Sequence, residues 1–229
     1  GPFPILLKNA RMQMRFRQSL PSIDYFQMDI MGGTLLGDLR ILDHHDRYHL
    51  QMNGAFSGLD ADRLLQRGNA GGPRDQNIIN EDTQISGRMS LQVPITASAR
   101  TVMDNLDAVF RLTHIGARTL ERLLYAMDPH ENNESIVQQR ALLKKGTPRW
   151  IEVVIKHGNL SLTGEVMVGG TNIRLPAIKR LNLASLPIQK RIQNLAGRLV
   201  PLLNGLKILS ADTLRVERGG AIDFTEDGK

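Results

Sequence analysis

Residues 35–41 read Leu-Leu-Gly-Asp-Leu-Arg-Ile, so that aliphatic side chains and one glycine occupy alternate positions. Alternation with a period of two is typical of a β-strand that buries one face. The same apolar-x-Gly-x-apolar-x-apolar pattern returns at 85–91 and 162–168, with a weaker copy at 52–56. The repeat therefore predicts several strands, each with a glycine on the same face as its aliphatic side chains.

A glycine inside a strand weakens it, and it usually marks a bend or a close approach of two backbones. Because Gly37, Gly87 and Gly164 recur at matching positions of the repeat, we expect them to let one face of the sheet close up and curl. A plain antiparallel sandwich with each glycine beneath a bulky neighbour is the alternative, and the pattern alone leaves both open.

The alternation extends well beyond the repeat. It covers 11–17 and 26–30, and Gly32-Gly33 and residues 43–46 are expected turns before a return strand at 48–52. Further strands are expected at 85–93, 108–112, 151–155, 160–168 and 173–175, and near 208 and 214–216. The fold class that follows is an α+β chain dominated by an antiparallel, curved β-sheet of repeated hairpins.

A helical hairpin is expected near 117–146. Leu120, Leu123, Leu124 and Met127 follow helical spacing, and a second helix begins after Asn132 or Asn133 and ends before Gly146. One further amphipathic helix is expected near 186–203, covering the sheet. A short helical turn at 61–66 leads into residues 67–81, whose Gly, Asn and Asp predict a flexible loop.

The organisation along the chain follows from these elements. Residues 3–99 are expected to form a β-meander segment, and residues 100–229 to continue the same sheet with the helical hairpin, further β-hairpins and the covering helix. Gly1-Pro2 matches the remnant left by a common tag-removing protease, so we expect the chain to be a piece of a longer protein.

Composition argues against several kinds of chemistry. The chain has no cysteine, which excludes disulfides and thiolate catalysis, and no apolar run approaches the roughly 18 residues that span a bilayer. Neither a phosphate-binding loop nor a nucleophile-base pattern is present, so we expect no enzyme activity and no cofactor. His44 and His45 lie beside Asp43 and Asp46, but consecutive strand residues point to opposite faces, which favours a polar turn over a metal site.

The net charge is +6, from 29 basic and 23 acidic residues, and the basic excess is concentrated between Lys144 and Arg198. Such a surface is either simply solvated or meets anionic lipid, an acidic partner or nucleic acid. Nucleic acid is disfavoured, because this half offers few aromatic side chains for base stacking. Lys190, Arg191 and Arg198 lie opposite the apolar stripe of the helix at 186–203, which suits contact with lipid headgroups or a partner and equally suits a helix packed on the sheet.

Three short segments resemble a known family: residues 31–39 (MGGTLLGDL), 55–60 (AFSGLD, before a short Leu-Leu helix) and 158–164 (GNLSLTG). Here the chain resembles the AsmA-like proteins of the Gram-negative cell envelope, which are related to TamB. The resemblance implies a periplasmic, U-shaped β-sheet of a protein anchored in the inner membrane. It also implies an apolar groove that carries phospholipid or another acyl lipid between the two membranes, for outer-membrane biogenesis and homeostasis.

The lipid-binding residues that the resemblance implies are the aliphatic members of the repeats: Leu35, Leu39, Ile41, Met89, Leu91, Leu162, Val166 and Val168. The alternative is a structural or adaptor module that docks an envelope protein through its basic surface. The helical stretch at 117–146 departs from the strand periodicity of the family, and this leaves open whether the groove is continuous or plugged.

Overall fold

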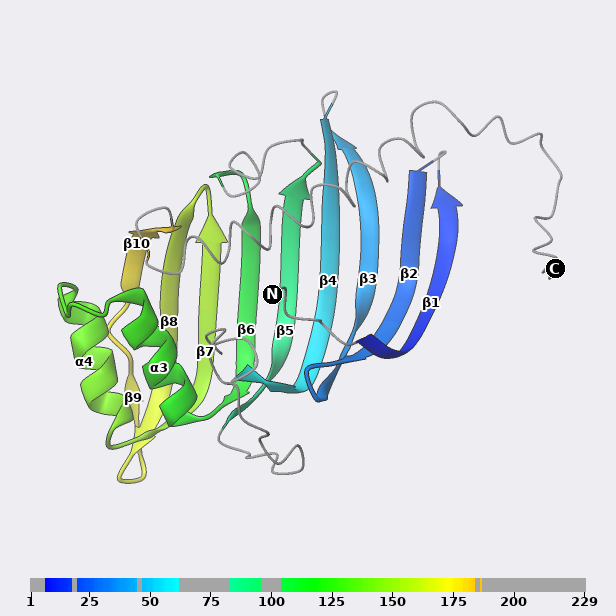
Figure 1. Ribbon diagram of the computed structural model, residues 1–229. Helices are drawn as coiled ribbons and strands as arrows, with labels where there is room; N and C mark the ends of the chain where they lie inside the picture. The colour runs from blue at the N-terminus through cyan, green and yellow to red at the C-terminus, as the bar shows by residue number, and fades with distance from the viewer. Residues whose placement is uncertain are drawn as a thin grey trace, which may run out of the picture.

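The computed structural model describes residues 7–17, 20–44, 47–61, 83–95, 104–183 and Leu186. These residues form one open antiparallel sheet of ten strands, which curves along its length (Figure 1). The strands are β1 (Leu7–Arg17), β2 (Leu20–Ile30), β3 (Gly33–His44), β4 (Arg47–Asp60), β5 (Gln84–Pro94), β6 (Asp107–Ile115), β7 (Thr147–Lys156), β8 (Asn159–Val168), β9 (Thr171–Arg174) and β10 (Ile178–Asn182).

The sheet is a meander in which strands adjacent in sequence pair with each other from β1 to β8; β10 and β9 both pair with β8. Tight turns explain this order. Met31 and Gly32, which join β2 to β3, have φ values of 50° and 81°, and His157 and Gly158, which join β7 to β8, have 49° and 72°. Two consecutive residues with positive φ make a hairpin turn whose twist matches that of the flanking strands.

The prediction of a mainly antiparallel, curved sheet is confirmed. The pairing of β5 with β6 carries the sheet across residue 100 without a break. The helical turn beyond Ala61, the loop at 67–81, the helix at 186–203 (apart from Leu186) and the strands near 208 and 214–216 lie outside the described residues.

Strand β10 was not predicted. It pairs with β8, and its register shifts between Ile178 and Leu181. This irregularity places two apolar residues of the same face three positions apart, so the period-two signal of a strand is lost.

Two helices, α3 (Ala117–Met127) and α4 (Glu134–Leu143), lie between β6 and β7 in the sequence. The side chain of Asn133 caps α4 by accepting a hydrogen bond from the backbone N–H of Ile136 at 3.2 Å. The carboxylate of Asp128 accepts from the backbone N–H groups of Asn132 and Asn133, at 3.0 and 2.7 Å. These bonds fix the connection between the two helices, which lie together at the β7–β10 end of the sheet (Figure 1).

Arg140 of α4 holds the two helices together. Its Nε donates to Oε1 of Glu121 in α3, and one terminal nitrogen donates to Oε1 of Glu131 in the connection, both at 2.8 Å. The guanidinium also lies 5.0 Å from the centre of the Tyr125 ring, within the range of a cation–π interaction. Partial burial lowers the pKa of Arg140, but the hydrogen bonds and charges of the two glutamates outweigh this and raise the pKa overall.

Replacing Arg140 with glutamine is expected to lower the free energy of unfolding by about 1 to 2 kcal/mol, because two charge-assisted hydrogen bonds are lost. Hydrogen exchange should accelerate first in the backbone amides of α4. The matched control is Arg118→Gln, which removes an exposed arginine of α3. Equal effects of the two substitutions on exchange in α4 would contradict this role of Arg140.

Candidate functional site: the apolar face of the sheet

Two rows of cross-strand neighbours run from β1 to β10 and contain only apolar side chains and glycine. The first row is Met12, Phe26, Gly37, Gly54, Met89, Phe110, Val153, Leu162 and Ile178. The second row is Met14, Ile23, Leu39, Met52, Leu91, Ala108, Ile155, Leu160 and Leu181. Cross-strand neighbours share one face of a sheet, so these rows define the apolar face.

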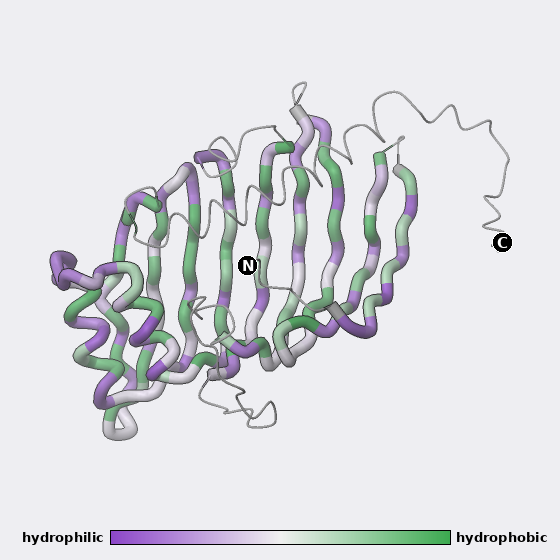
Figure 2. The backbone as a smooth tube through the Cα atoms, viewed as in Figure 1, coloured by the Kyte–Doolittle hydropathy of each residue, from purple (hydrophilic) through white to green (hydrophobic). Residues whose placement is uncertain are grey.

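The opposite face, which we call the polar face, carries the alternate residues of each strand. Figure 2 shows the alternation of hydrophobic and hydrophilic residues along the strands. On the polar face Arg111 of β6 pairs with Glu152 of β7 at 2.6 Å, and the Ser90 hydroxyl donates to Oδ1 of Asn53 at 2.8 Å. The sheet is therefore amphipathic across its whole width.

The repeat glycines bring neighbouring strands close together on the apolar face. A Cβ atom on Gly37 would collide with the backbone carbonyl oxygen of Asn53 in β4, and one on Gly87 with that of Arg111 in β6. None of the repeat glycines has a positive φ, so they are needed for space and not for a left-handed conformation. This close approach agrees with the expectation of a sheet whose one face closes up.

Gly164 combines both roles that the sequence left open. A Cβ atom there would lie 2.7 Å from the carbonyl oxygen of Trp150 and 2.6 Å from the side-chain tip of Ile151. The glycine thus sits beneath a bulky neighbour and also permits a close backbone approach. Within the described residues, however, the strands form a single sheet and not a sandwich.

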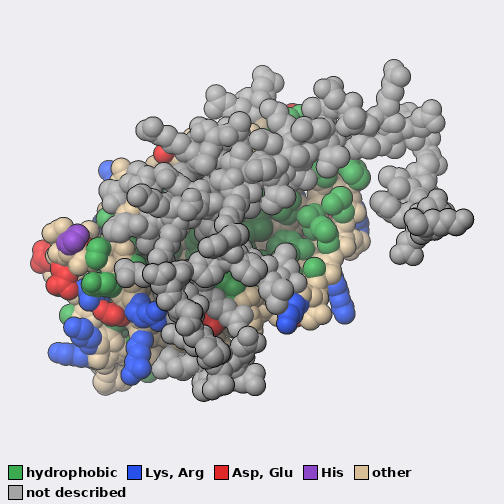
Figure 3. Space-filling model, viewed as in Figure 1, with side chains coloured by type: hydrophobic (Ala, Val, Ile, Leu, Met, Phe, Trp, Pro, Cys, Tyr) green, Lys and Arg blue, Asp and Glu red, His purple; other side chains and the backbone are tan. Residues whose placement is uncertain are grey.

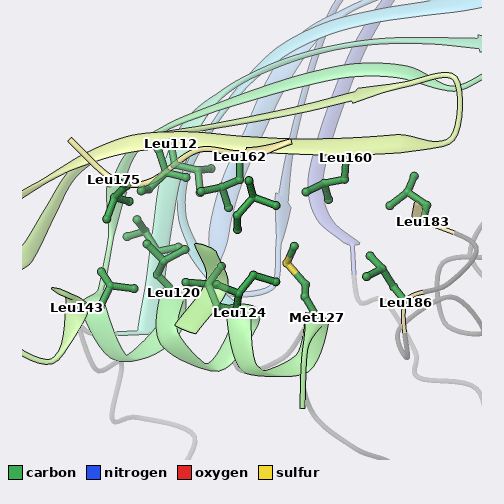
Figure 4. Packing of buried hydrophobic residues seen from close by; sticks show 14 of the residues in the cluster. Leu112, Leu120, Leu124, Met127, Leu143, Leu160, Leu162, Leu175, Leu183 and Leu186 are labelled. Atoms are coloured by element: carbon green, nitrogen blue, oxygen red, sulfur yellow. The ribbon is translucent and has the colours of Figure 1, made fainter. Parts of the chain in front are cut away.

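Helices α3 and α4, which we call the helical cover, close the apolar face at one end. In Figure 4 the side chains of Leu120, Leu124 and Met127 on α3 point toward Leu160 and Leu162 of β8. Leu124 and Ile136 have no exposed surface, and the same cluster includes Leu112, Leu143, Leu175 and Ile178. The face near β7–β10 is therefore a packed core.

The eight residues predicted to bind lipid all lie on the apolar face, but their surroundings differ. Leu35, Leu39, Met89, Leu91 and Val168 are half-buried, whereas Ile41, Leu162 and Val166 are buried. Leu162 and Val166 belong to the core that includes residues of the helical cover. Lys190, Arg191 and Arg198 lie outside the described residues.

Several residues of the same face were not singled out from the sequence as site residues, notably Met12, Met52 and Phe110. Their signal was present as period-two alternation, but Met12 and Phe110 lie outside the glycine-centred repeat and Met52 belongs only to its weaker copy at 52–56. Only the register of the strands shows that they belong to the same rows.

Toward β1 the apolar face is different in character. The helical cover lies at the opposite end of the sheet (Figure 1), and Figure 3 shows hydrophobic side chains at the surface near β1 and β2. Met12, Met14 and Phe16 of β1 are 62%, 49% and 58% exposed. The four strand spacings from β1 to β5, at about 4.8 Å each, give this part of the face a width of about 19 Å.

The described ranges contain no cluster of three His, Asp or Glu side chains that could bind a metal ion. Of the predicted polar turn, His45 and Asp46 lie outside those ranges. Neither α3 nor α4, the helices of the described part, has the length and apolar character that crossing a membrane requires.

No protein-family model matches the chain, and neither the curated proteins nor the solved structures include one that is significantly similar to it.

Proposed function

We propose that the apolar face over β1–β5 binds the acyl chains of phospholipid. In this proposal the chain is a non-enzymatic, periplasmic part of a Gram-negative envelope protein that holds or conducts lipid between the membranes. The observation that supports it most is the pair of apolar rows, which cross every strand of the sheet path from β1 to β10 without a charged residue. The resemblance to AsmA-like proteins is the reason for choosing phospholipid and the envelope.

The dimensions of the face suit an acyl chain. The hydrocarbon core of a bilayer is about 30 Å thick, so one acyl chain extends about 15 Å. This length fits within the width of about 19 Å between β1 and β5. Each methylene group that leaves water for an apolar surface contributes about 0.8 kcal/mol, so even a partly covered chain would bind favourably.

The helical cover sets the end of this binding surface. Leu162 and Val166 are buried in the core beneath it, and this core reaches Phe56 of β4 and Val93 of β5, so an acyl chain that enters from β1 would end against the half-buried residues that pack on the core. The lipid contacts expected from this arrangement are therefore Leu35, Leu39, Met89 and Leu91, together with Met52. Val168 of β8, which packs against the core at the covered end, would not take part.

A photo-crosslinking amino acid tests this surface directly. Placed at Leu39 of the apolar face, it is expected to form at least about tenfold more adduct with phospholipid than at Leu36, because only the first position would contact acyl chains. Leu36 is a suitable control since it is also a leucine of β3, is 42% exposed and lies on the polar face. The adducts are measured by mass spectrometry after illumination with phosphatidylethanolamine and phosphatidylglycerol vesicles.

Equal labelling from both positions, or labelling of protein alone, would contradict lipid binding on this face. Native mass spectrometry then separates the two functions considered for the chain. Co-purified lipid supports the proposal, whereas lipid-free protein that retains an envelope partner favours the adaptor role.

A further inference from the structure

Strand β1 ends the sheet at the side opposite the helical cover. In the described part of the chain this eleven-residue strand pairs with β2 alone, through nine residue pairs. The other edge of an outermost strand presents backbone N–H and C=O groups that can pair with a further strand. The register shifts between Lys8 and Arg11, where Asn9 has a φ of 50°, so the regular part of this edge runs from Arg11 to Arg17.

From Arg11 to Arg17 the apolar face of β1 carries neither a charge nor a proline. Proteins often guard such strands with inward-pointing charges or proline, which disfavour further pairing. In this part of β1 the three residues on the apolar face are Met12, Met14 and Phe16, and about half or more of each side chain is exposed. By contrast Phe26, the cross-strand neighbour of Met12 in β2, is only 5% exposed. An additional strand beside β1 would bring its own apolar side chains next to these three.

The polar face of β1 specifies the charge of its partner. Lys8, Arg11 and Arg15 lie on this face and are exposed, and β1 contains no acidic residue. On the side of β2, Arg15 already pairs with Asp24 at 2.8 Å. Opposite charges in cross-strand positions stabilise a sheet and like charges destabilise it, which favours an acidic partner strand and disfavours a second β1.

We propose that the outer edge of β1 accepts an extended segment of another protein, in which apolar residues alternate with acidic ones. The segment would pair with β1 through main-chain hydrogen bonds, the mode of recognition known as β-strand addition. Its apolar side chains would continue the apolar face beside Met12, Met14 and Phe16. Its carboxylates would lie on the polar face beside Lys8, Arg11 and Arg15. This inference does not depend on lipid binding.

Peptide binding tests the proposal in the absence of lipid. The probe is a fluorescent eleven-residue peptide of alternating leucine and glutamate, with two comparison peptides. One replaces glutamate with lysine, and the other keeps the sequence but carries N-methyl groups on alternate backbone nitrogens along the edge that faces β1. Fluorescence anisotropy is expected to show saturable binding of the first peptide and at least about tenfold weaker binding of the other two.

Two variants of the protein locate the site. Met14→Lys places a charge on the apolar face of β1 and is expected to weaken binding of the leucine-glutamate peptide at least about tenfold. Gln13→Lys is the matched control, because it adds the same charge to the neighbouring exposed residue on the polar face. It is expected to leave the affinity unchanged or to increase it. Both residues are exposed, so both variants are expected to fold.

Several results would overturn the proposal. If the lysine peptide binds as tightly as the glutamate peptide, β1 does not select an acidic partner. If the N-methylated peptide binds equally well, main-chain hydrogen bonds to β1 are not formed. An unchanged affinity of Met14→Lys places the peptide elsewhere. A complete lack of binding shows that the edge is closed to partners or already occupied by this chain. If sedimentation shows a dimer that Met14→Lys dissociates, the edge binds a second copy of the chain.

Discussion

Replacing Gly37 with alanine is expected to lower the free energy of unfolding by at least about 2 kcal/mol, because the added methyl group has no room. Its Cβ atom would collide with the backbone carbonyl oxygen of Asn53 in β4 and lie 2.9 Å from the Cα atom of Gly54. Both obstacles belong to the backbone, so no side-chain rotation relieves them. Strands β3 and β4 would have to move apart, which weakens the hydrogen bonds of an eleven-pair register.

The matched control is Gly54→Ala, at the position directly opposite in β4. Its Cβ atom would lie 2.9 Å from the Leu36 carbonyl oxygen and 3.4 Å from the flexible end of Met89, so a smaller loss is expected. Urea unfolding followed by circular dichroism measures both variants. Neither Gly37 nor Gly54 has a positive φ value, so alanine can adopt the backbone conformation at both positions. The difference between the two variants therefore reports the space available for the added methyl group. Similar stability of the two variants would show that the strands separate easily and that Gly37 does not set their approach.

The local elements were largely predictable from the sequence. Period-two alternation identified the regular strands, and Gly32-Gly33 marked the turn between β2 and β3, which the structure places at Met31 and Gly32. Helix α4 was marked by Asn133 at its start and Gly146 beyond its end, as local capping chemistry requires. These features depend on residues close in sequence, which is why one sequence was sufficient.

The continuity of the apolar face was not predictable, because it depends on register between strands. Leu35 and Leu36 are consecutive leucines, and the pattern alone does not show how strongly each is buried. Pairing with Phe56 places Leu35 on the apolar face, while Leu36 opposite Ala55 is 42% exposed on the polar face. A shift of one residue would exchange the two faces.

Which part of the sheet the helical cover lies over was also not predictable from the sequence. The apolar stripe of α3 predicted a helix with one face packed against another element. Leu120 and Leu124 of this stripe are buried, which confirms the helical spacing. The stripe did not show that the cover lies over β8, at the end of the sheet opposite β1 and β2 (Figure 1). For this reason Leu39 and Val166 received the same prediction, although one is half-buried and the other lies within the core.

Replacing Leu124 with alanine is expected to lower the free energy of unfolding by about 3 kcal/mol, the usual cost of a cavity in a core that cannot collapse around it. Leu124 has no exposed surface and points from α3 toward the sheet (Figure 4). The matched control is Leu36→Ala on the polar face, where the same change removes a side chain that is 42% exposed. That control is expected to cost less than about 1 kcal/mol.

Two spectroscopic signals show whether the helical cover is part of the core or a separable lid. Trp150, the chain's single tryptophan, donates from Nε1 to Glu165 at 3.0 Å and so reports on the pairing of β7 with β8, whereas circular dichroism at the helical wavelengths reports on α3 and α4. If the cover and the sheet share one core, Leu124→Ala shifts both urea transitions by the same amount. If the helical signal alone is lost at lower urea, the cover opens independently of the sheet. The lipid-binding part of the apolar face would then extend from β5 to β10 in the open state, and Val166 would become a lipid contact instead of a core residue.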